Sequence, residues 1–238
     1  MVGPGGALGA ADRLCLACVE LLGVDGAAIS LMHEGATRGT FGSSGEVSRQ
    51  LDELQFTFGE GPCLDAISHG RPVLVSDLED QYDRRWPAFT PAVLEAGVRA
   101  VFALPAPLAT AAIGVLDLFR NEPGPLTSEG LTGGLLAAEL AALPLLDLVG
   151  ADVDWKALGE SGYGWSQLES LERVEVYQAT GMVMEQLGVG PTDALVRLRA
   201  HAFAAEKTAS DVAWDVIERR LVLTPDDAWR QRDDGASQ

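Results

Sequence analysis

The chain has 238 residues, enough for two domains or one large domain with a sizeable core. Its composition, 47% hydrophobic and 22% charged, is typical of a folded soluble protein, and no apolar run reaches transmembrane length, because even 135–149 contains Glu139 and Pro144. The formal net charge of −18 repels nucleic acid at long range, so any RNA binding requires a local cluster of cations.

The N-terminal residues lack a basic region followed by a hydrophobic core, which argues against a signal peptide and predicts a cytoplasmic protein. We expect residues 1–11 to be disordered. Three cysteines are too few for a disulfide scaffold. Cys15 and Cys18 have the spacing of a redox or zinc half-site, but they lie in an apolar helical run and no second pair follows. We therefore expect buried structural cysteines and no metal site.

Residues 12–149 mix helical and strand patterns. Helices are expected at 12–22, 47–54, 64–69, 87–96 and 130–146, and strands at 27–32, 37–42, 72–76, 100–105 and 112–119. The last two strands are adjacent and predict a hairpin. Antiparallel strands with helices grouped around them predict an α+β sandwich.

The segment Gly59-Glu60-Gly61-Pro62-Cys63 predicts a sharp bend followed by a helix, because the glycines permit unusual backbone angles and Pro62 suits a first helical turn. With it, the residues 54–66, 77–78, 85–87, 97–101 and 113–118 resemble a GAF domain, specifically the GAF half of GAF–ANTAR regulators. The resemblance implies a sensor domain whose ligand pocket lies between the sheet and its covering helices and loops.

Five polar or aromatic residues are our candidates for lining that pocket: Cys63, Asp65, His69, Trp86 and Arg99. The alternative places Cys63 and Trp86 in the core and Asp65 and Arg99 on the surface. The Asn-Lys…Phe…Asp-Glu signature of cyclic-nucleotide-binding GAF domains is broken after Asn121-Glu122, so no cofactor or cyclic nucleotide is expected. No common catalytic motif is present, and Cys63 stands alone where sulfoxide-reducing GAF enzymes use several cysteines, so we expect no enzyme.

The glycine-rich segment 150–164 predicts a linker, and Trp155 and Tyr163 within it suggest that it packs partly on a domain. Residues 165–225 then predict three short helices, and residues 226–238 a frayed polar tail. On the first helix Leu168, Val176, Ala179, Val183 and Leu187 form one apolar face, and Val174, Tyr177, Gly181 and Met184 form another. A second apolar face requires a partner, within the bundle or from another chain.

The second helix has a stripe of Leu195, Leu198, Ala202 and Ala205, and the third has Ala209, Val212, Ala213, Val216 and Ile217. Thr208 and Asp211 have the spacing of a capping box. The matches at Arg173, Gln178-Ala179, Gly181-Met182, Ala194, Leu198-Arg199, Ala202 and Asp211-Val212-Ala213 resemble the all-α, three-helix ANTAR domain, the RNA-binding module of bacterial antiterminators. Thr180 replaces the Lys that the family commonly has, which removes one phosphate partner.

The resemblance implies that the cations of this segment face RNA: Arg173, Arg197, Arg199, Lys207, Arg219 and Arg220, with His201 one turn from Arg197. Alternatively, these cations form a solvated face with helix ion pairs such as Asp215 with Arg219. Our leading hypothesis is a homodimeric antitermination regulator, whose GAF domain senses a small molecule or partner and whose ANTAR domain binds nascent RNA hairpin loops. The alternatives are a GAF-based interaction scaffold without RNA and a GAF enzyme of the sulfoxide reductase type.

Overall fold

A computed structural model describes residues 4–33, 36–80, 84–108, 111–144 and 173–224. The chain divides into two compact units, Met1–Glu172 and Arg173–Gln238, called here the N-terminal and C-terminal units. The expected linker at 150–164, with Trp155 and Tyr163, and the tail at 226–238 lie outside the described residues, as does Leu168. Within these ranges no helix is both long and apolar enough to cross a membrane.

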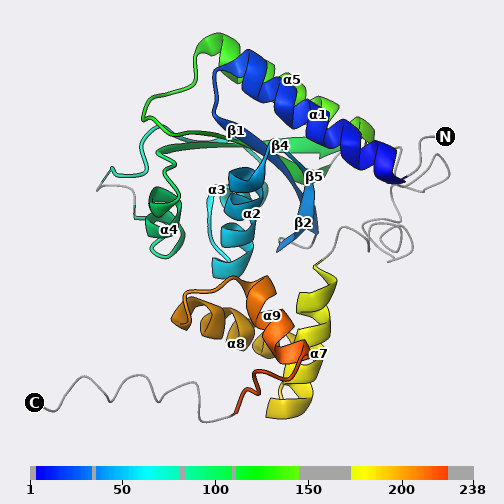
Figure 1. Cartoon of the computed structure of the whole chain (residues 1–238). Helices are drawn as coiled ribbons and strands as arrows, with labels where there is room; N and C mark the ends of the chain where they lie inside the picture. The colour runs from blue at the N-terminus through cyan, green and yellow to red at the C-terminus, as the bar shows by residue number, and fades with distance from the viewer. Residues whose placement is uncertain (1–3, 34–35, 81–83, 109–110, 145–172, 225–238) are drawn as a thin grey trace, which may run out of the picture. The chain divides into compact units, whose positions relative to one another are not determined.

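The N-terminal unit is built on a five-stranded antiparallel sheet (Figure 1). The strands are β1 (Gly26–His33), β2 (Ala36–Ser43), β3 (Val73–Val75), β4 (Ala100–Leu108) and β5 (Ala111–Arg120). Their spatial order is β2-β1-β5-β4-β3. The expected α+β architecture and the hairpin between β4 and β5 are confirmed.

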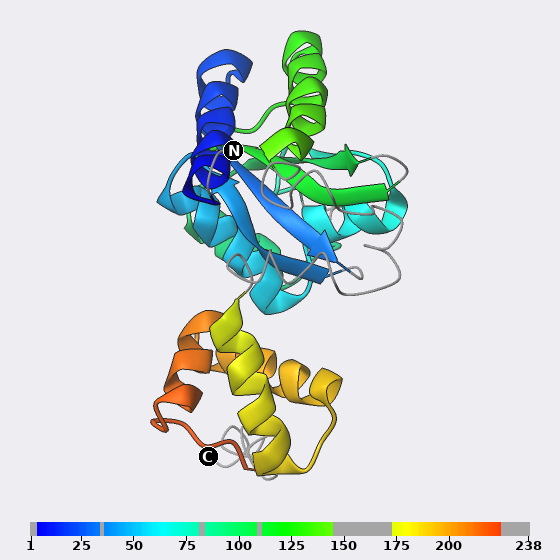
Figure 2. The ribbon, with the colours of Figure 1, turned by 90° about the vertical axis from the view of Figure 1, so that its right-hand side faces the viewer.

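Helices cover both faces of this sheet. Helices α1 (Pro4–Leu22) and α5 (Ser128–Leu140) lie side by side on one face (Figure 2). Helices α2 (Glu46–Phe58), α3 (Pro62–His69) and α4 (Phe89–Glu95) cover the other. Strand alternation supplies a separate core to each layer, because successive side chains point to opposite faces. Leu116 and Leu118 pack under α1 and α5, whereas Val115 and Phe119 pack under α2, α3 and α4.

Two helices are longer than the sequence pattern predicts. Helix α1 begins at Pro4, before the expected start near residue 12, because a proline fits a first turn and the alanines that follow favour helix. Helix α2 continues past residue 54 to Phe58. It ends where Gly59 adopts a left-handed φ of 65° and donates its N–H to the Gln55 carbonyl at 3.0 Å.

The C-terminal unit is a three-helix bundle of α7 (Val174–Leu187), α8 (Pro191–Ala204) and α9 (Ala209–Ile217). Its core is formed mainly by small and β-branched side chains, among them Val176, Ala179, Val183, Ala202, Val212 and Val216, together with Leu198 and Leu223. Gly188 ends α7 in the left-handed conformation, and Pro191 opens α8. The expected capping box is present, with the Asp211 N–H donating to the Thr208 hydroxyl at 3.0 Å.

The structure corrects one detail of the expected helix faces and shows, for another, that the bundle does not cover the second face of α7. Ala205 is exposed rather than part of the α8 stripe, because α8 ends at Ala204 and Ala205 caps it. On α7 the second apolar face, including Val174, Tyr177 and Gly181, is exposed, whereas the face with Val176, Ala179 and Val183 is buried. The bundle itself therefore uses one face of α7.

The close approach of α1 to β2 requires glycine at position 42. A Cβ atom built on Gly42 lies 2.6 Å from the Ala11 Cβ and 2.8 Å from its carbonyl carbon, closer than real contacts allow. We predict that Gly42→Ala lowers the free energy of unfolding by about 1–3 kcal/mol, because the backbone of α1 must shift. Gly45→Ala is the control, since Gly45 has extended backbone and open space. Urea unfolding followed by circular dichroism measures both, and equal losses would contradict the prediction.

Candidate functional site

A cluster of polar side chains is buried between α2 and the sheet. This α2 polar cluster consists of Ser30, Thr40, Asp52, Gln55 and Asp117. The Asp52 carboxylate on α2 accepts hydrogen bonds from both hydroxyls, with its Oδ1 bound by Ser30 Oγ of β1 and its Oδ2 bound by Thr40 Oγ1 of β2 at 2.5 Å. Each carboxylate oxygen is therefore paired, which offsets much of the cost of burying it.

Asp117 is less well satisfied than Asp52. It lies on β5 opposite Ala28 and Ala103, and its Oδ2 accepts a hydrogen bond from Gln55 Nε2 at 2.8 Å. No described residue hydrogen-bonds its Oδ1, although the side chain is buried. Burial raises the pKa of Asp117 to about 7, the Gln55 hydrogen bond acts in the opposite direction, and the Asp52 charge raises it.

Gln55 connects this cluster to the Gly59–Cys63 loop. Its Oε1 accepts the Cys63 backbone N–H at 2.8 Å while its Nε2 binds Asp117, so the amide is held at both ends. Gly61 has a φ of 140°, and a Cβ there would lie 2.6 Å from Gln55 Oε1. The side chain of Glu60 points to the other side, where Oε1 accepts the N–H groups of Ala88 and Phe89 at 2.6 and 2.8 Å. The bend expected here is thus tied to both the sheet and α4.

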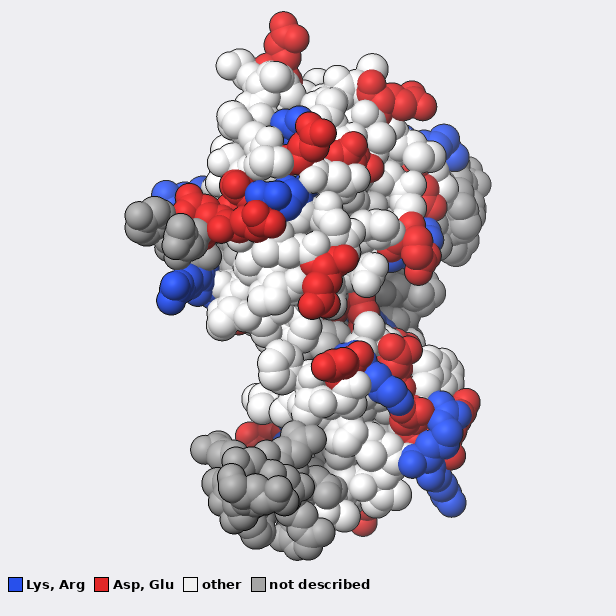
Figure 3. Space-filling view, turned by 60° about the vertical axis from the view of Figure 1, so that its left-hand side comes forward, with Lys and Arg blue, Asp and Glu red and all other residues white. Residues whose placement is uncertain are grey.

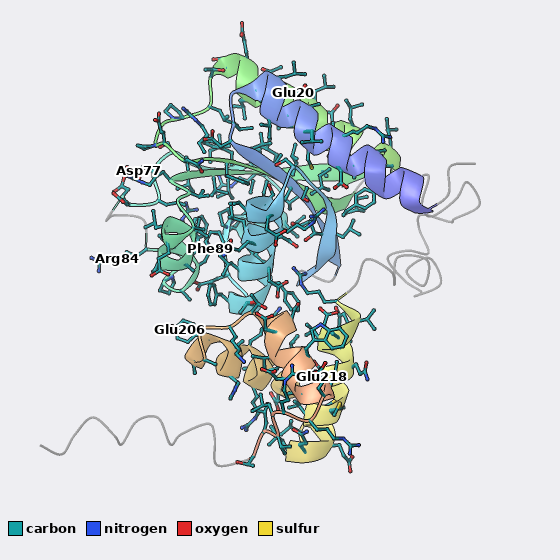
Figure 4. The ribbon with its side chains drawn as sticks, viewed as in Figure 1. Glu20, Asp77, Arg84, Phe89, Glu206 and Glu218 are labelled. Atoms are coloured by element: carbon teal, nitrogen blue, oxygen red, sulfur yellow. The ribbon has the colours of Figure 1, made fainter. Side chains whose placement is uncertain are left out.

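Two of the five expected pocket residues belong to the core. Cys63 is fully buried, and Trp86 packs edge-on against Phe89 with ring centroids 6.2 Å apart. In Figure 4 Phe89 extends from α4 toward α2. Arg85 covers the outer side of Trp86, with its guanidinium carbon 4.3 Å from the ring centroid.

The other three lie nearer the surface, with Asp65 and His69 one turn apart on α3 and Arg99 outside that helix. Asp65 on α3 pairs with Arg85 at 3.7 Å, and His69 is exposed at the end of α3. Arg99 pairs with Asp77 and Glu79, each at 2.9 Å. Asp77 lies at the outer edge of the unit (Figure 4). The hydrogen bond from Arg99 lowers the pKa of Asp77. The five candidates therefore do not converge on one pocket.

Sequence reasoning missed the α2 polar cluster, although one signal for it was visible. Asp117 interrupts an otherwise apolar strand, and buried carboxylates require partners. The partners come from 62 or more residues away in the chain, which is why no local pattern identifies them. A separate open groove of about 350 Å³ lies at the N-terminal end of α2, between Ser44, Glu46, Gly97 and Asn121, and none of the five candidates lines it.

The cysteines have no exposed thiol. Cys15 and Cys18 on α1 are buried against the sheet, and Cys63 is buried on its opposite side. Burial raises the pKa of Cys18 to about 11. The pKa of Cys15 is raised as well, mainly by burial and secondly by the neighbouring Cys18. Across the described ranges, no group of His, Cys, Asp and Glu side chains has the geometry to hold a metal ion.

The cations of the C-terminal unit differ in exposure. Arg173 is buried, only 7% exposed, whereas Arg197, Arg199 and His201 are half-buried along α8. Lys207, Arg219 and Arg220 are exposed around the two ends of α9. On the face drawn in Figure 3, basic side chains lie among acidic ones rather than in a continuous basic area.

Asp215 binds two of these cations, but not the one expected. Its carboxylate pairs with Lys207 and with Arg220, each at 2.7 Å, and Arg220 also pairs with Glu218. The helical spacing of four residues offered Arg219 as one partner in the alternative interpretation of these cations. Arg219 instead has a left-handed φ of 59°, so the chain turns there and Arg220 reaches Asp215. The hydrogen bonds from Lys207 and Arg220 lower the pKa of Asp215.

The side chain of Thr180 points into the bundle and does not reach a surface where a phosphate could bind. Its side chain is buried and donates to the Val176 carbonyl one turn earlier, at 2.7 Å. The family's Lys at this position is thus replaced by a small side chain that packs inside the bundle.

Comparison with known families decides the assignment. The sequence model of the GAF domain matches residues 9–143, and that of the ANTAR domain matches residues 167–217. The chain belongs to the GAF family and carries a C-terminal ANTAR domain. This GAF–ANTAR architecture is the one that the sequence resemblance implied. A search of curated proteins found no match.

Several solved structures are similar to the chain. A type II free methionine-R-sulfoxide reductase from Thermoplasma acidophilum shares 16% identity, with a TM-score of 0.49 over 60% of this chain and 95% of its own. The GAF domain region of a putative membrane protein from Geobacter sulfurreducens shares 17%, with a TM-score of 0.48 over 58% and 92%. A domain of a putative sensor histidine kinase from Sinorhizobium meliloti shares 16%, with a TM-score of 0.47 over 58% and 90%.

Asp117 makes the stability of the GAF domain depend on pH. Its folded pKa of about 7 lies above the ordinary value of 3.8, so the folded state binds the proton more tightly. Its contribution to stability is complete below about pH 4 and is lost as pH rises through about 7, with a slope of up to about 1.4 kcal/mol per pH unit. We predict that Asp117→Asn removes this loss, measured as urea unfolding between pH 5 and pH 8 relative to wild type. Parallel curves for the two proteins would contradict it.

Proposed function

We propose that this GAF–ANTAR protein is a transcription antitermination regulator. Its GAF domain senses a small molecule or protein partner, and its ANTAR domain binds the loop of a nascent RNA hairpin. Binding holds the transcript in a form that prevents a terminator hairpin. The observation that carries this proposal is the joint match to a GAF sensor and an ANTAR output domain in one chain.

The charge distribution supports RNA binding by the ANTAR domain. Between residues 173 and 224 the sequence has six lysines and arginines against seven acidic residues, whereas the whole chain has a net charge of −18. This domain is therefore the part of the protein that repels a polyanion least. We propose Arg197, Arg199, Lys207, Arg219 and Arg220 as its RNA contacts, and we leave out Arg173 because its side chain is buried.

For the GAF domain, we propose that ligand contact involves the candidates that reach the surface: Asp65, His69 and Arg99. Cys63 and Trp86 belong to the core between the sheet and the helices α2, α3 and α4. We also propose that the protein acts in the cytoplasm, where a nascent transcript is accessible.

The alternative functions use the same fold differently. In a dimeric GAF scaffold without RNA binding, the ANTAR cations would serve only in ion pairs within the protein, as Lys207 and Arg220 do with Asp215. An enzyme of the sulfoxide reductase type requires an accessible thiolate, and the burial of all three cysteines disfavours it.

We propose a homodimer that forms through α1 and α5. Leu136 on α5 and Leu143 just beyond its end are exposed, and so are Leu16 and Leu21 on the neighbouring α1. Two adjacent helices with exposed leucines form an apolar surface of the kind that subunit interfaces bury.

Light scattering at micromolar concentration should therefore give twice the chain mass of 25.1 kDa. The double substitution Leu136→Asp and Leu143→Asp should shift the protein toward monomer, because it places charges in the interface. Val47→Asp is the matched control and should leave the mass unchanged, because Val47 is exposed on α2, on the opposite face of the sheet. A wild-type protein with the mass of a single chain would refute the dimer.

If the ANTAR cations contact phosphates, removing each one should weaken the salt dependence of RNA binding. We predict that Arg197→Ala, Lys207→Ala and Arg219→Ala each reduce the slope of log K against log salt by about 0.7 to 0.9. Arg49→Ala, an exposed arginine of the GAF domain, is the control with the same change in charge. Binding to a hairpin selected from a transcript pool is measured at several salt concentrations, and unchanged slopes in all three variants would rule out this set of contacts.

A further inference from the structure

The outward side of α8 carries exposed apolar groups. Phe203 is 58% exposed and Val196 57% exposed, and Ala200 and Ala204 between and beside them are exposed as well. Positions 200, 203 and 204 follow position 196 by four, seven and eight residues, so all four lie on one side of the helix. We call this stripe the α8 face. The opposite side of the helix, with Ala194, Leu198 and Ala202, is buried in the bundle.

Cations border the α8 face on both sides. Because successive residues turn by about 100°, Arg199 and Arg197 lie on opposite edges of the exposed side. Both side chains are half-buried. Asp193 lies in the first turn of α8, and from position 194 to 205 the sequence has no acidic residue.

The exposed Trp214 of the ANTAR domain has acidic neighbours. Trp214 on α9 is exposed, but Asp211 and Glu218 lie one helical turn away on either side of it. Glu218, at the end of α9, and Glu206, just beyond α8, are labelled in Figure 4. Glu206 follows Phe203 by three residues at one end of the α8 face, whereas Trp214 has acidic residues on both sides. Phosphate groups are therefore repelled more at Trp214 than along the edges that Arg197 and Arg199 form.

We propose that the α8 face is the surface on which unpaired bases of the RNA loop stack. Phe203 supplies the ring against which a base lies, and Val196 and Ala200 extend the apolar surface. Arg197 and Arg199 bind the phosphates on either side. An aromatic platform between cations is the arrangement that single-stranded nucleic acid requires, because its bases are unstacked and its backbone is charged. This inference rests on the proposed RNA binding and goes beyond it by assigning the helix and the stacking residue.

The test uses the full-length protein and a pool of RNA hairpins with a fixed stem and a randomised loop. Hairpins enriched by the wild type are measured against Phe203→Ala, Phe203→Tyr and Val222→Ala. Phe203→Ala should weaken binding about 5- to 150-fold, the range for removing one aromatic–base stack. Phe203→Tyr keeps the ring and should retain most of the affinity. Val222→Ala removes an equally exposed apolar group, 56% exposed, outside α8 and should have no effect.

A fully paired duplex of the same stem separates stacking from charge. It has phosphates but no unpaired bases, so Phe203→Ala should bind it as the wild type does, and Arg197→Ala should bind it more weakly. Equal affinity of the wild type and Phe203→Ala for the enriched hairpins would overturn the α8 assignment while leaving RNA binding in place. Failure of the wild type to enrich any hairpin would overturn RNA binding itself. A change from dimer to monomer in Phe203→Ala would make the α8 face a protein interface and also overturn the proposal.

Discussion

The side-chain amide of Gln55 holds together three parts of the GAF domain that are distant in sequence. It joins α2 to β5 through Asp117 and to the start of α3 through the Cys63 N–H. Both bonds are buried, so breaking either one leaves an unpaired polar group in the core, at a cost of about 1–3 kcal/mol. The position of α3 therefore depends on the orientation of one amide. The absence of a side chain at Gly61 follows from the same constraint, because any Cβ would collide with that amide.

The Gln55 amide leaves one oxygen of the Asp117 carboxylate on the sheet without a hydrogen bond from any described residue. Gln55 offers one N–H to a carboxylate that has two oxygens, and the nearby Asp52 carboxylate is already paired with two hydroxyls. The remaining Asp117 oxygen has no donor among the described residues. Burial raises the pKa of Asp117, the single hydrogen bond from Gln55 offsets only part of that rise, and the Asp52 charge adds to it.

Much of this architecture could be predicted from the sequence, because the signals were local. Alternating apolar residues identified the strands, and Thr208 with Asp211 identified the start of α9. The motif residues of the Gly59–Cys63 loop indicated its bend, but not why Glu60 is there, since its partners Ala88 and Phe89 come from a different loop. The candidate ligand residues were chosen by type, and the structure separates them because burial and pairing depend on tertiary contacts. The exchange of Arg219 for Arg220 at Asp215 likewise depends on a single left-handed residue that the helical pattern does not reveal.

The carboxylate of Asp215 connects the segment before α9 to the segment after it. Lys207 precedes the helix and Arg220 follows it, and both ends converge on one acceptor. An incoming phosphate does not meet free cations here, because it must compete with an anion that is already bound. Each phosphate contact then exchanges one acceptor for another, so it contributes less binding free energy than a contact with an unpaired cation. Such an exchange favours ligands that engage Lys207 and Arg220 together, so this end of the bundle selects for the spacing of charges more than for their number.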